Sequence, residues 1–185
     1  MTHLVQHTAA GEGAELTAPD AVLTVKIDAG HTDGHYELFE VDAPRGPATP
    51  LHRTGWGKAY YVLHGRMIVQ IEAEGFDLGP GSSITIPPGA LHTFTVLSPT
   101  AKFLVVSLTG AMGAFHADLH ATVPHGRPLE EAGQEIQQVL GRHDVTVAGF
   151  EASSSSPPPT SRPSDSGHSA SASTTCSSAA ARSSA

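Results

Sequence analysis

Residues 81–94 read GSSITIPPGALHTF and indicate the fold class of this chain. The alternating segment SITI ends at a Pro-Pro-Gly step, and another strand-like segment begins at His92. Because proline lacks a backbone donor and glycine readily adopts positive φ angles, this step predicts a tight turn between two short strands. Upstream, residues 50–65 read PLHRTGWGKAYYVLHG and repeat the arrangement, with strand-like segments around a Gly-Trp-Gly turn and a histidine, His52, close to it.

These two segments resemble the two signature motifs of the cupin superfamily. The second motif there runs Gly, five residues, Pro-x-Gly, two residues, His, three residues, Asn, and this chain departs from it only at Val96, which replaces the asparagine. The first motif runs Gly, five residues, His-x-His, three or four residues, Glu, six residues, Gly. Here Thr54 stands at the second histidine and Lys58 at the glutamate. The matching positions are Gly46, His52, Gly65, Gly81, Pro87, Gly89 and His92.

Composition and charge exclude several classes of function. The 185 residues suffice for one domain, and the formal net charge is -8 with no cluster of basic residues. Nucleic-acid binding is not expected, because neutralising phosphates requires grouped Lys and Arg. No apolar run is long enough for a bilayer, and residues 1–7 lack the features of a signal peptide. The single cysteine, Cys176, excludes an intrachain disulfide. We therefore expect a cytoplasmic protein without membrane or nucleic-acid partners.

Short alternating segments separated by Gly and Pro turns recur from residue 22 to residue 108. This spacing is typical of an all-β sandwich or barrel. The resemblance selects the double-stranded β-helix of the cupins, which is a small jelly-roll barrel. The expected strands cover residues 22–27, 36–41, 51–54, 59–63, 66–73, 76–78, 83–86, 92–97 and 102–108.

Short C-terminal helices are expected to follow the barrel. Residues 112–122 and 129–140 are the candidates, and the second has apolar residues at helical spacing before the stop residue Gly141, with a short strand at 145–147. From residue 152 the chain consists almost wholly of Ser, Ala, Pro and Thr. Such a segment buries too little apolar surface to offset its ordering entropy. We predict a cupin domain over residues 1–151 and a disordered tail over 152–185.

A metal site is one interpretation of the motif residues. By resemblance, His52, Thr54, Lys58 and His92 face the barrel interior, where alternate side chains of each strand point. His52 and His92 would then hold one divalent metal ion. Non-haem iron takes two histidines and a carboxylate, and zinc takes three or four donors, so a further ligand is needed. The Lys58 ammonium would repel such a cation. The candidates for the further ligand are His64, His35 and Glu37.

The other interpretation gives the pocket no metal. A lysine inside an apolar barrel loses hydration, so its pKa falls towards neutrality. Lys58 would then transfer protons with His52 or His92 as the opposing group, and Tyr60 would donate to a developing oxyanion. Metal-free cupins that act as sugar epimerases or dehydratases use chemistry of this kind, and the pocket is similar to theirs. The opposing possibility is that Lys58 extends to the barrel mouth and only caps the pocket.

Thr54, Trp56 and Phe94 are the expected substrate-binding residues. Trp56 and Phe94 supply apolar walls for a ring-bearing substrate, although core packing also explains Phe94. His116 and His120 are one helical turn apart, which is a spacing found in zinc sites. No acidic residue or third histidine is placed beside them by the sequence, so we expect them on an exposed helix face.

We therefore predict a small-molecule enzyme with no metal or little metal, an isomerase, lyase or cyclase acting on an oxygenated substrate, as in secondary metabolism. The alternatives are a metal-dependent dioxygenase resembling quercetinase and a non-catalytic ligand-binding or regulatory cupin. The fold does not choose among them, since cupins host many chemistries. The resemblance also implies a homodimer, because many small cupins pair through an N-terminal strand.

Overall fold

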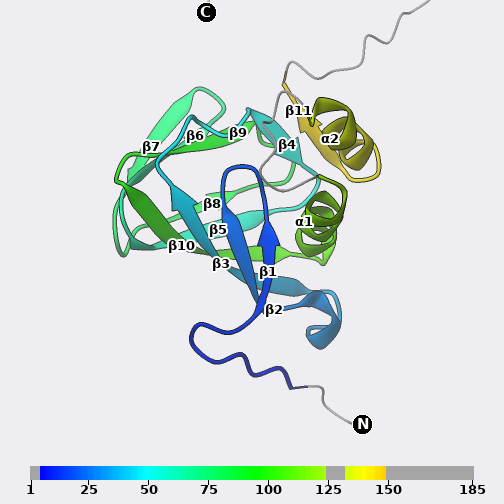
Figure 1. Ribbon diagram of the computed structural model, residues 1–185. Coiled ribbons are helices and arrows are strands. Elements are labelled where there is room, and N and C mark those ends of the chain that lie inside the picture. Colours follow the sequence, from blue (N-terminus) through cyan, green and yellow to red (C-terminus); the bar gives the residue numbers. More distant parts are fainter. Residues whose placement is uncertain (1–4, 124–131, 149–185) are drawn as a thin grey trace, which may run out of the picture. The chain divides into compact units, whose positions relative to one another are not determined.

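Two antiparallel sheets make up most of the computed structural model, which describes residues 5–123 and 132–148. One sheet has the strand order β1-β2-β3-β10-β5-β8, and the other has the order β11-β4-β9-β6-β7 (Figure 1). The expected all-β jelly roll with short C-terminal helices is confirmed. The strands are β1 Ala14–Thr17, β2 Val22–Ile27, β3 Tyr36–Pro44, β4 His52–Thr54, β5 Lys58–His64, β6 Met67–Ile71, β7 Glu74–Leu78, β8 Ser83–Ile86, β9 His92–Val96, β10 Thr100–Leu108 and β11 Val145–Val147.

The core lies between the inner faces of the sheets. Strands β3 and β10 alternate buried and more accessible side chains along their length, as a half-buried strand should. Their register places Val41 beside Phe103 and Phe39 beside Val105, and all four side chains are buried. The second sheet contributes Met67, Val69, Leu78 and Val96 to the same cluster. Burying one such side chain stabilises the fold by about 1.5–3 kcal/mol, so this alternation fixes which residues face the interior.

No clear sequence signal marks β1. Its four residues, AELT, are mostly exposed, so apolar alternation cannot reveal it. Pairing holds this strand in place, with Leu16 opposite Leu23 of β2. After β1 the chain turns back at residues 18–21, where the backbone of Ala18 donates to the carbonyl of Ala21 at 2.8 Å. This turn brings Asp20 to the cavity described below.

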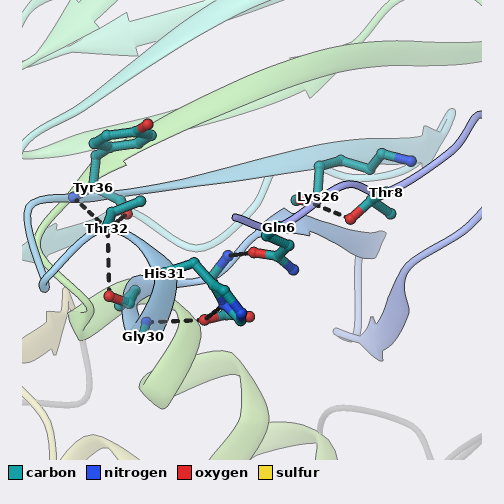
Figure 2. Close-up of polar contacts among 9 residues, drawn as sticks. Gln6, Thr8, Lys26, Gly30, His31, Thr32 and Tyr36 are labelled. Carbon is teal, nitrogen blue, oxygen red and sulfur yellow. Dashed lines mark hydrogen bonds and ion pairs between the residues drawn. The ribbon is translucent and has the colours of Figure 1, made fainter. Parts of the chain in front are cut away.

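The segment before β1 is fastened to β2 and to the short 3-10 helix η1 (Ala29–His31) that follows it, as Figure 2 shows. The backbone N–H of Asp28 donates to the side chain of Gln6 at 2.9 Å, and the hydroxyl of Thr8 donates to the carbonyl of Lys26 at 2.9 Å. These contacts anchor the N-terminal edge of the larger sheet, from which the turn at residues 18–21 projects.

Two helices, α1 (Ala111–Thr122) and α2 (Gly133–Leu140), lie side by side near β4 and β11 (Figure 1). The first begins one residue before its predicted start. Residues 129–131 of the second predicted helix, and the predicted tail at 152–185, lie outside the described residues, so the domain boundary stays a prediction. Asp118 of α1 connects this helix to the segment just after α2, because it accepts hydrogen bonds from Arg142 and His143 at 2.9 Å each.

Within the described part of the chain, neither helix is long and apolar enough to cross a membrane.

Candidate functional site

A cavity with an open mouth lies among the two sheets and the two helices. Its walls are mostly apolar, with a few polar side chains among them. Small-molecule sites have this character, since apolar walls supply affinity and a few polar groups fix orientation. The predicted site residues that line the cavity are His52, Thr54, Trp56, Lys58, Tyr60 and Phe94.

His52 and His92 form an imidazole pair at one wall. They are direct cross-strand partners in the pairing of β4 with β9, and their ring centroids are 4.1 Å apart. Nδ1 of His52 is 2.8 Å from the carbonyl of Pro50, and Nδ1 of His92 is 2.8 Å from the carbonyl of Ala90. Because a carbonyl only accepts, each Nδ1 carries the proton and each neutral ring keeps its lone pair on Nε2.

Burial keeps both rings uncharged. It lowers the pKa of His52 from its ordinary value of 6.5 to about 4 and that of His92 to about 3, with the charge of Lys58 as the second cause. His52 lines the cavity, whereas His92 is 1% exposed and lies behind it. Among the described residues, Nε2 of His92 has no hydrogen-bond partner. His52 is therefore the imidazole that a ligand can reach first.

Lys58 lies inside the barrel. It begins β5, between Ser107 of β10 and Ile86 of β8, and only 8% of the residue is exposed. Its Nζ is 5.9 Å from the centroid of the Tyr60 ring and has no hydrogen bond or ion pair with any residue that the structure describes. Burial lowers its pKa from 10.5 to about 7, and the charge of Asp20 opposes that shift. Lys58 thus lines the cavity, and its role there stays a prediction.

Aromatic side chains form much of the wall beside Lys58. The ring of Tyr60 meets Phe94 edge-on, with centroids 6.5 Å apart, and tilts against Phe103 at 5.2 Å. Phe94 therefore packs in the core and lines the cavity at once. Burial raises the pKa of Tyr60 well above its ordinary value, so its phenol stays a neutral donor. The aromatic arrangement suits a flat ring better than a flexible polar chain.

Trp56 and Thr54 differ in what they offer a ligand. The hydroxyl of Thr54 donates to the carbonyl of Trp56 at 3.0 Å and is already engaged. Trp56 is 4% exposed, and its indole Nε1 has no partner among the described residues. A buried donor without a partner costs about 1–3 kcal/mol. Because Nε1 itself is buried, the indole offers the cavity an apolar wall.

Sequence reasoning missed two polar residues of the cavity. Asp20 reaches it from the turn after β1, and burial raises the pKa of its carboxyl. His116 reaches it from α1, donates from Nδ1 to the carbonyl of Met112 at 2.9 Å, and has its pKa lowered to about 4 by burial. The prediction that His116 lies on an exposed helix face is therefore wrong. The other histidine of that pair, His120, accepts a hydrogen bond from the backbone N–H of Thr17 on β1.

The signal for His116 was present in the sequence. Met112, Phe115, His116 and Leu119 recur at helical spacing, and all four line the cavity. No comparable local pattern marks Asp20, which arrives through the pairing of β1 with β2.

The donor set does not fit the divalent metal that the resemblance implies. No group of three or more His, Cys, Asp or Glu side chains is placed to hold a metal ion within residues 5–123 and 132–148. None of the suggested further ligands lines the cavity. His64 and His35 are exposed, and the carboxylate of Glu37 accepts a hydrogen bond from the backbone N–H of Gly113 at 2.9 Å. Two imidazoles beside a buried amine make a poor cation site.

Comparison with known proteins connects this geometry to a family. Residues 38–107 match the family model of the cupin domain. Over 110 residues the chain is 24% identical to quercetin 2,3-dioxygenase of Bacillus subtilis (strain 168), a match that covers 59% of this chain. The chain spans about a third of that relative's length, since the match covers 33% of it.

Two solved structures are similar in fold. KdgF from Halomonas sp. superposes with a TM-score of 0.51 at 18% identity, over 57% of this chain and 94% of that one. The polyketide cyclase RemF from Streptomyces resistomycificus has a TM-score of 0.47 at 29% identity, over 58% of this chain and 80% of that one.

Proposed function

Since this chain is a member of the cupin superfamily, we propose that it is a small-molecule enzyme that transfers protons without a metal. The reaction is an isomerisation, dehydration or cyclisation of an oxygenated ring compound. The observation that carries this proposal is the buried amine of Lys58, which has no hydrogen bond or ion pair in the described chain and shares an apolar cavity with the imidazole of His52.

The protonation states support proton transfer in both directions. A pKa of about 7 leaves Lys58 divided between ammonium and amine near neutral pH, so it can give or take a proton. His52 is neutral at that pH, and its Nε2 lone pair accepts a proton while the carbonyl of Pro50 holds the ring in place. A positioned acid or base of this kind contributes about 10²–10⁴-fold to a rate.

The walls support a substrate with a flat apolar body and at least one oxygen. Tyr60 and Phe94 face the body of such a ligand, and the amine of Lys58 is a donor for its oxygen. The catalytic roles of Lys58, His52, His92 and Tyr60 are predictions of this proposal. The expected homodimer likewise stays a prediction.

A metal-dependent dioxygenase is the second candidate, because the relative from Bacillus subtilis bears the name quercetin 2,3-dioxygenase. The replacement of two ligand positions by Thr54 and Lys58 counts against it, since of the four motif positions only His52 and His92 keep a usual metal ligand. A ligand-binding protein without catalysis is the third, and it would use the same cavity.

Binding is tested first. Trp56 is the sole tryptophan, so its fluorescence reports on the cavity wall directly. Chelator-treated protein is titrated with a panel of hydroxylated aromatic ketones, and compounds that quench Trp56 are carried forward. Each is then incubated with the protein in D₂O, and exchange of its carbon-bound protons is followed by NMR.

We expect exchange without added metal and a loss of about 10²–10⁴-fold in Lys58→Met. Lys102→Met, on the outer face of β10, is the matched control and should exchange at the normal rate. Activity that returns only with iron, manganese or nickel would establish the dioxygenase instead. Binding without exchange for every compound in the panel would leave a ligand-binding protein.

A further inference from the structure

The chain contains three lysines, Lys26, Lys58 and Lys102, and the structure gives them different surroundings. The ammonium of Lys26 donates to the carbonyls of Ala9 and Glu12 at 2.8 and 2.6 Å. Lys102 forms ion pairs with Glu40 at 2.8 Å and Asp42 at 3.1 Å, and these pairs raise its pKa. Both of these amines therefore donate to oxygen atoms of the chain.

The amine of Lys58 has none of these restraints. It lies in the cavity with no hydrogen bond or ion pair to the described residues, and it is 5.9 Å from the centre of the Tyr60 ring. Burial disfavours the ammonium, so a large share of Lys58 carries a nitrogen lone pair at neutral pH. A desolvated lysine amine in an apolar pocket is the nucleophile that enzymes use to form imines with carbonyl substrates.

We propose that Lys58 forms a covalent imine with an aldehyde or ketone group of the substrate, so that the substrate of this cavity is a carbonyl compound. The inference rests on the proposed function and identifies its substrate class. It also gives the lysine a task that a histidine or carboxylate at the same position could not perform.

The step balances without an oxidant or reductant. The lone pair of Nζ forms a bond to the carbonyl carbon, while the π pair of the C=O bond moves to oxygen. Nitrogen gives up two hydrogens, and these leave with the oxygen as water, so that amine and carbonyl yield imine and water. His52 is placed to carry a proton from nitrogen to the departing oxygen, because its Nε2 is free to accept and its Nδ1–H is fixed on Pro50.

The surroundings favour the covalent intermediate once it forms. A protonated imine draws electrons from the neighbouring carbon, which makes a proton there easier to remove. The titratable groups that share the cavity with Lys58 are Asp20, His52, Tyr60 and His116, with His92 behind His52. The removal of that proton is the first chemical event in an isomerisation or a dehydration, so the imine leads into the proposed reactions.

The experiment traps the imine by reduction. Full-length, chelator-treated protein is incubated at pH 7 with benzaldehyde and sodium cyanoborohydride, which converts an imine into a stable benzylamine. Peptide mass spectrometry then measures benzyl label at each lysine and, separately, at the α-amino group of Met1. The unprotonated fraction at pH 7 is about a thousandfold higher for an amine of pKa 7 than for one of pKa near 10.4.

Because nucleophilicity falls with basicity, we expect Lys58 to be labelled at least about tenfold faster than Lys26 and Lys102. The selectivity should disappear in denaturant, which exposes all three amines equally. The pH dependence of labelling should level off above about pH 7 for Lys58. Lys102→Arg should keep the label on Lys58, whereas Lys58→Arg should remove it.

Equal, slow labelling of the three lysines in the native protein would overturn the imine. If proton exchange on the ketone panel persisted in that case, the acid/base proposal would stand without it. Label on Lys58 with no exchange for any compound would support the imine and count against the wider enzymatic proposal. The two failures are therefore distinguishable.

Discussion

His52 of β4 and His92 of β9 lie directly opposite each other, with ring centroids 4.1 Å apart and each Nδ1 held 2.8 Å from a backbone carbonyl. The same geometry would orient two metal ligands, since ligating histidines usually donate their second N–H to such a carbonyl. Here the remaining positions of the set are Thr54 and Lys58. The two imidazoles therefore keep the orientation of ligands although the other two positions do not supply ligands, and several properties of the protein should reflect this.

Acid should destabilise the protein below about pH 6.5. Burial holds the pKa of His52 and His116 at about 4 and that of His92 at about 3, against 6.5 in the unfolded chain. The unfolded state thus binds more protons over this window, so stability is complete above pH 6.5 and is lost as the pH falls towards 3. Each group contributes up to about 1.4 kcal/mol per unit of pH across its window.

Urea unfolding at intervals from pH 4.5 to 7.5 measures how steeply the free energy of unfolding changes with pH. His116→Gln should flatten this slope, because one of the three buried imidazoles is gone. His64→Gln serves as the control and should leave the slope unchanged, since that side chain is exposed at the end of β5. A stability that is constant over the whole range would contradict the prediction.

Lys58→Met should stabilise the protein at neutral pH. The substitution keeps an apolar stem of similar length and removes an amine that is buried without a hydrogen bond or ion pair in the described chain. The folded-state pKa is about 7 and the unfolded one 10.5, so the cost of burying the amine is largest below pH 7 and disappears above 10.5. The gain, on the order of 1–3 kcal/mol at pH 7, should therefore shrink as the pH rises to 10.

Urea unfolding of the wild type and Lys58→Met at pH 6.5, 8 and 10 tests both the sign and the trend. Lys102→Met is the matched control at a lysine already satisfied by Glu40 and Asp42, and it should give no gain. A clear loss of stability in Lys58→Met at pH 6.5 would show that the amine has a stabilising partner in solution.

Restoring the two substituted ligand positions should create a metal site. Thr54→His combined with Lys58→Glu supplies a third imidazole and a carboxylate to His52 and His92, which completes a four-donor set. We expect affinity for Ni²⁺ or Zn²⁺ to rise by roughly 10² or more over the wild type, measured by calorimetry. Lys58→Met alone should raise it only slightly, because it removes a repelling charge and adds no ligand. Near-stoichiometric metal in purified wild-type protein would contradict this view of the site.

Asp118→Asn should speed the release of ligand from the cavity. Asp118 of α1 accepts from Arg142 and His143, which follow α2, so it ties together two helices whose residues line the cavity. The amide cannot accept both of these bonds with the strength of a carboxylate. Stopped-flow Trp56 fluorescence should show a faster off-rate, accompanied by a lower melting temperature.

Asp77→Asn is the matched control for this helix contact. It removes an exposed carboxylate that forms an ion pair with Arg66 at the β6–β7 hairpin. Neither Asp77 nor Arg66 lines the cavity. This variant should leave the off-rate unchanged. Equal effects of both substitutions would mean that the helix contact has no special role at the cavity.

Much of the fold was predictable from local sequence. Strands β2, β8 and β11 run as expected, because alternation between Gly and Pro turns is a property of short segments. Strand β3 continues three residues beyond its predicted end, to Pro44, because pairing with β10 extends to Thr100. Strand β1 is held by β2 and carries too few apolar residues to be seen alone.

The sequence by itself indicated an all-β sandwich or barrel from local spacing, and its resemblance to the cupin motifs implied the jelly roll, the motif positions of His52, Lys58 and His92, and the loss of two metal-ligand positions. Only the tertiary structure decided that Lys58 is buried without a hydrogen bond or ion pair in the described chain, and that Asp20 and His116 share its cavity. Those facts depend on segments far apart in the chain meeting around one space. A pKa follows burial and neighbouring charges, and both are set by that packing.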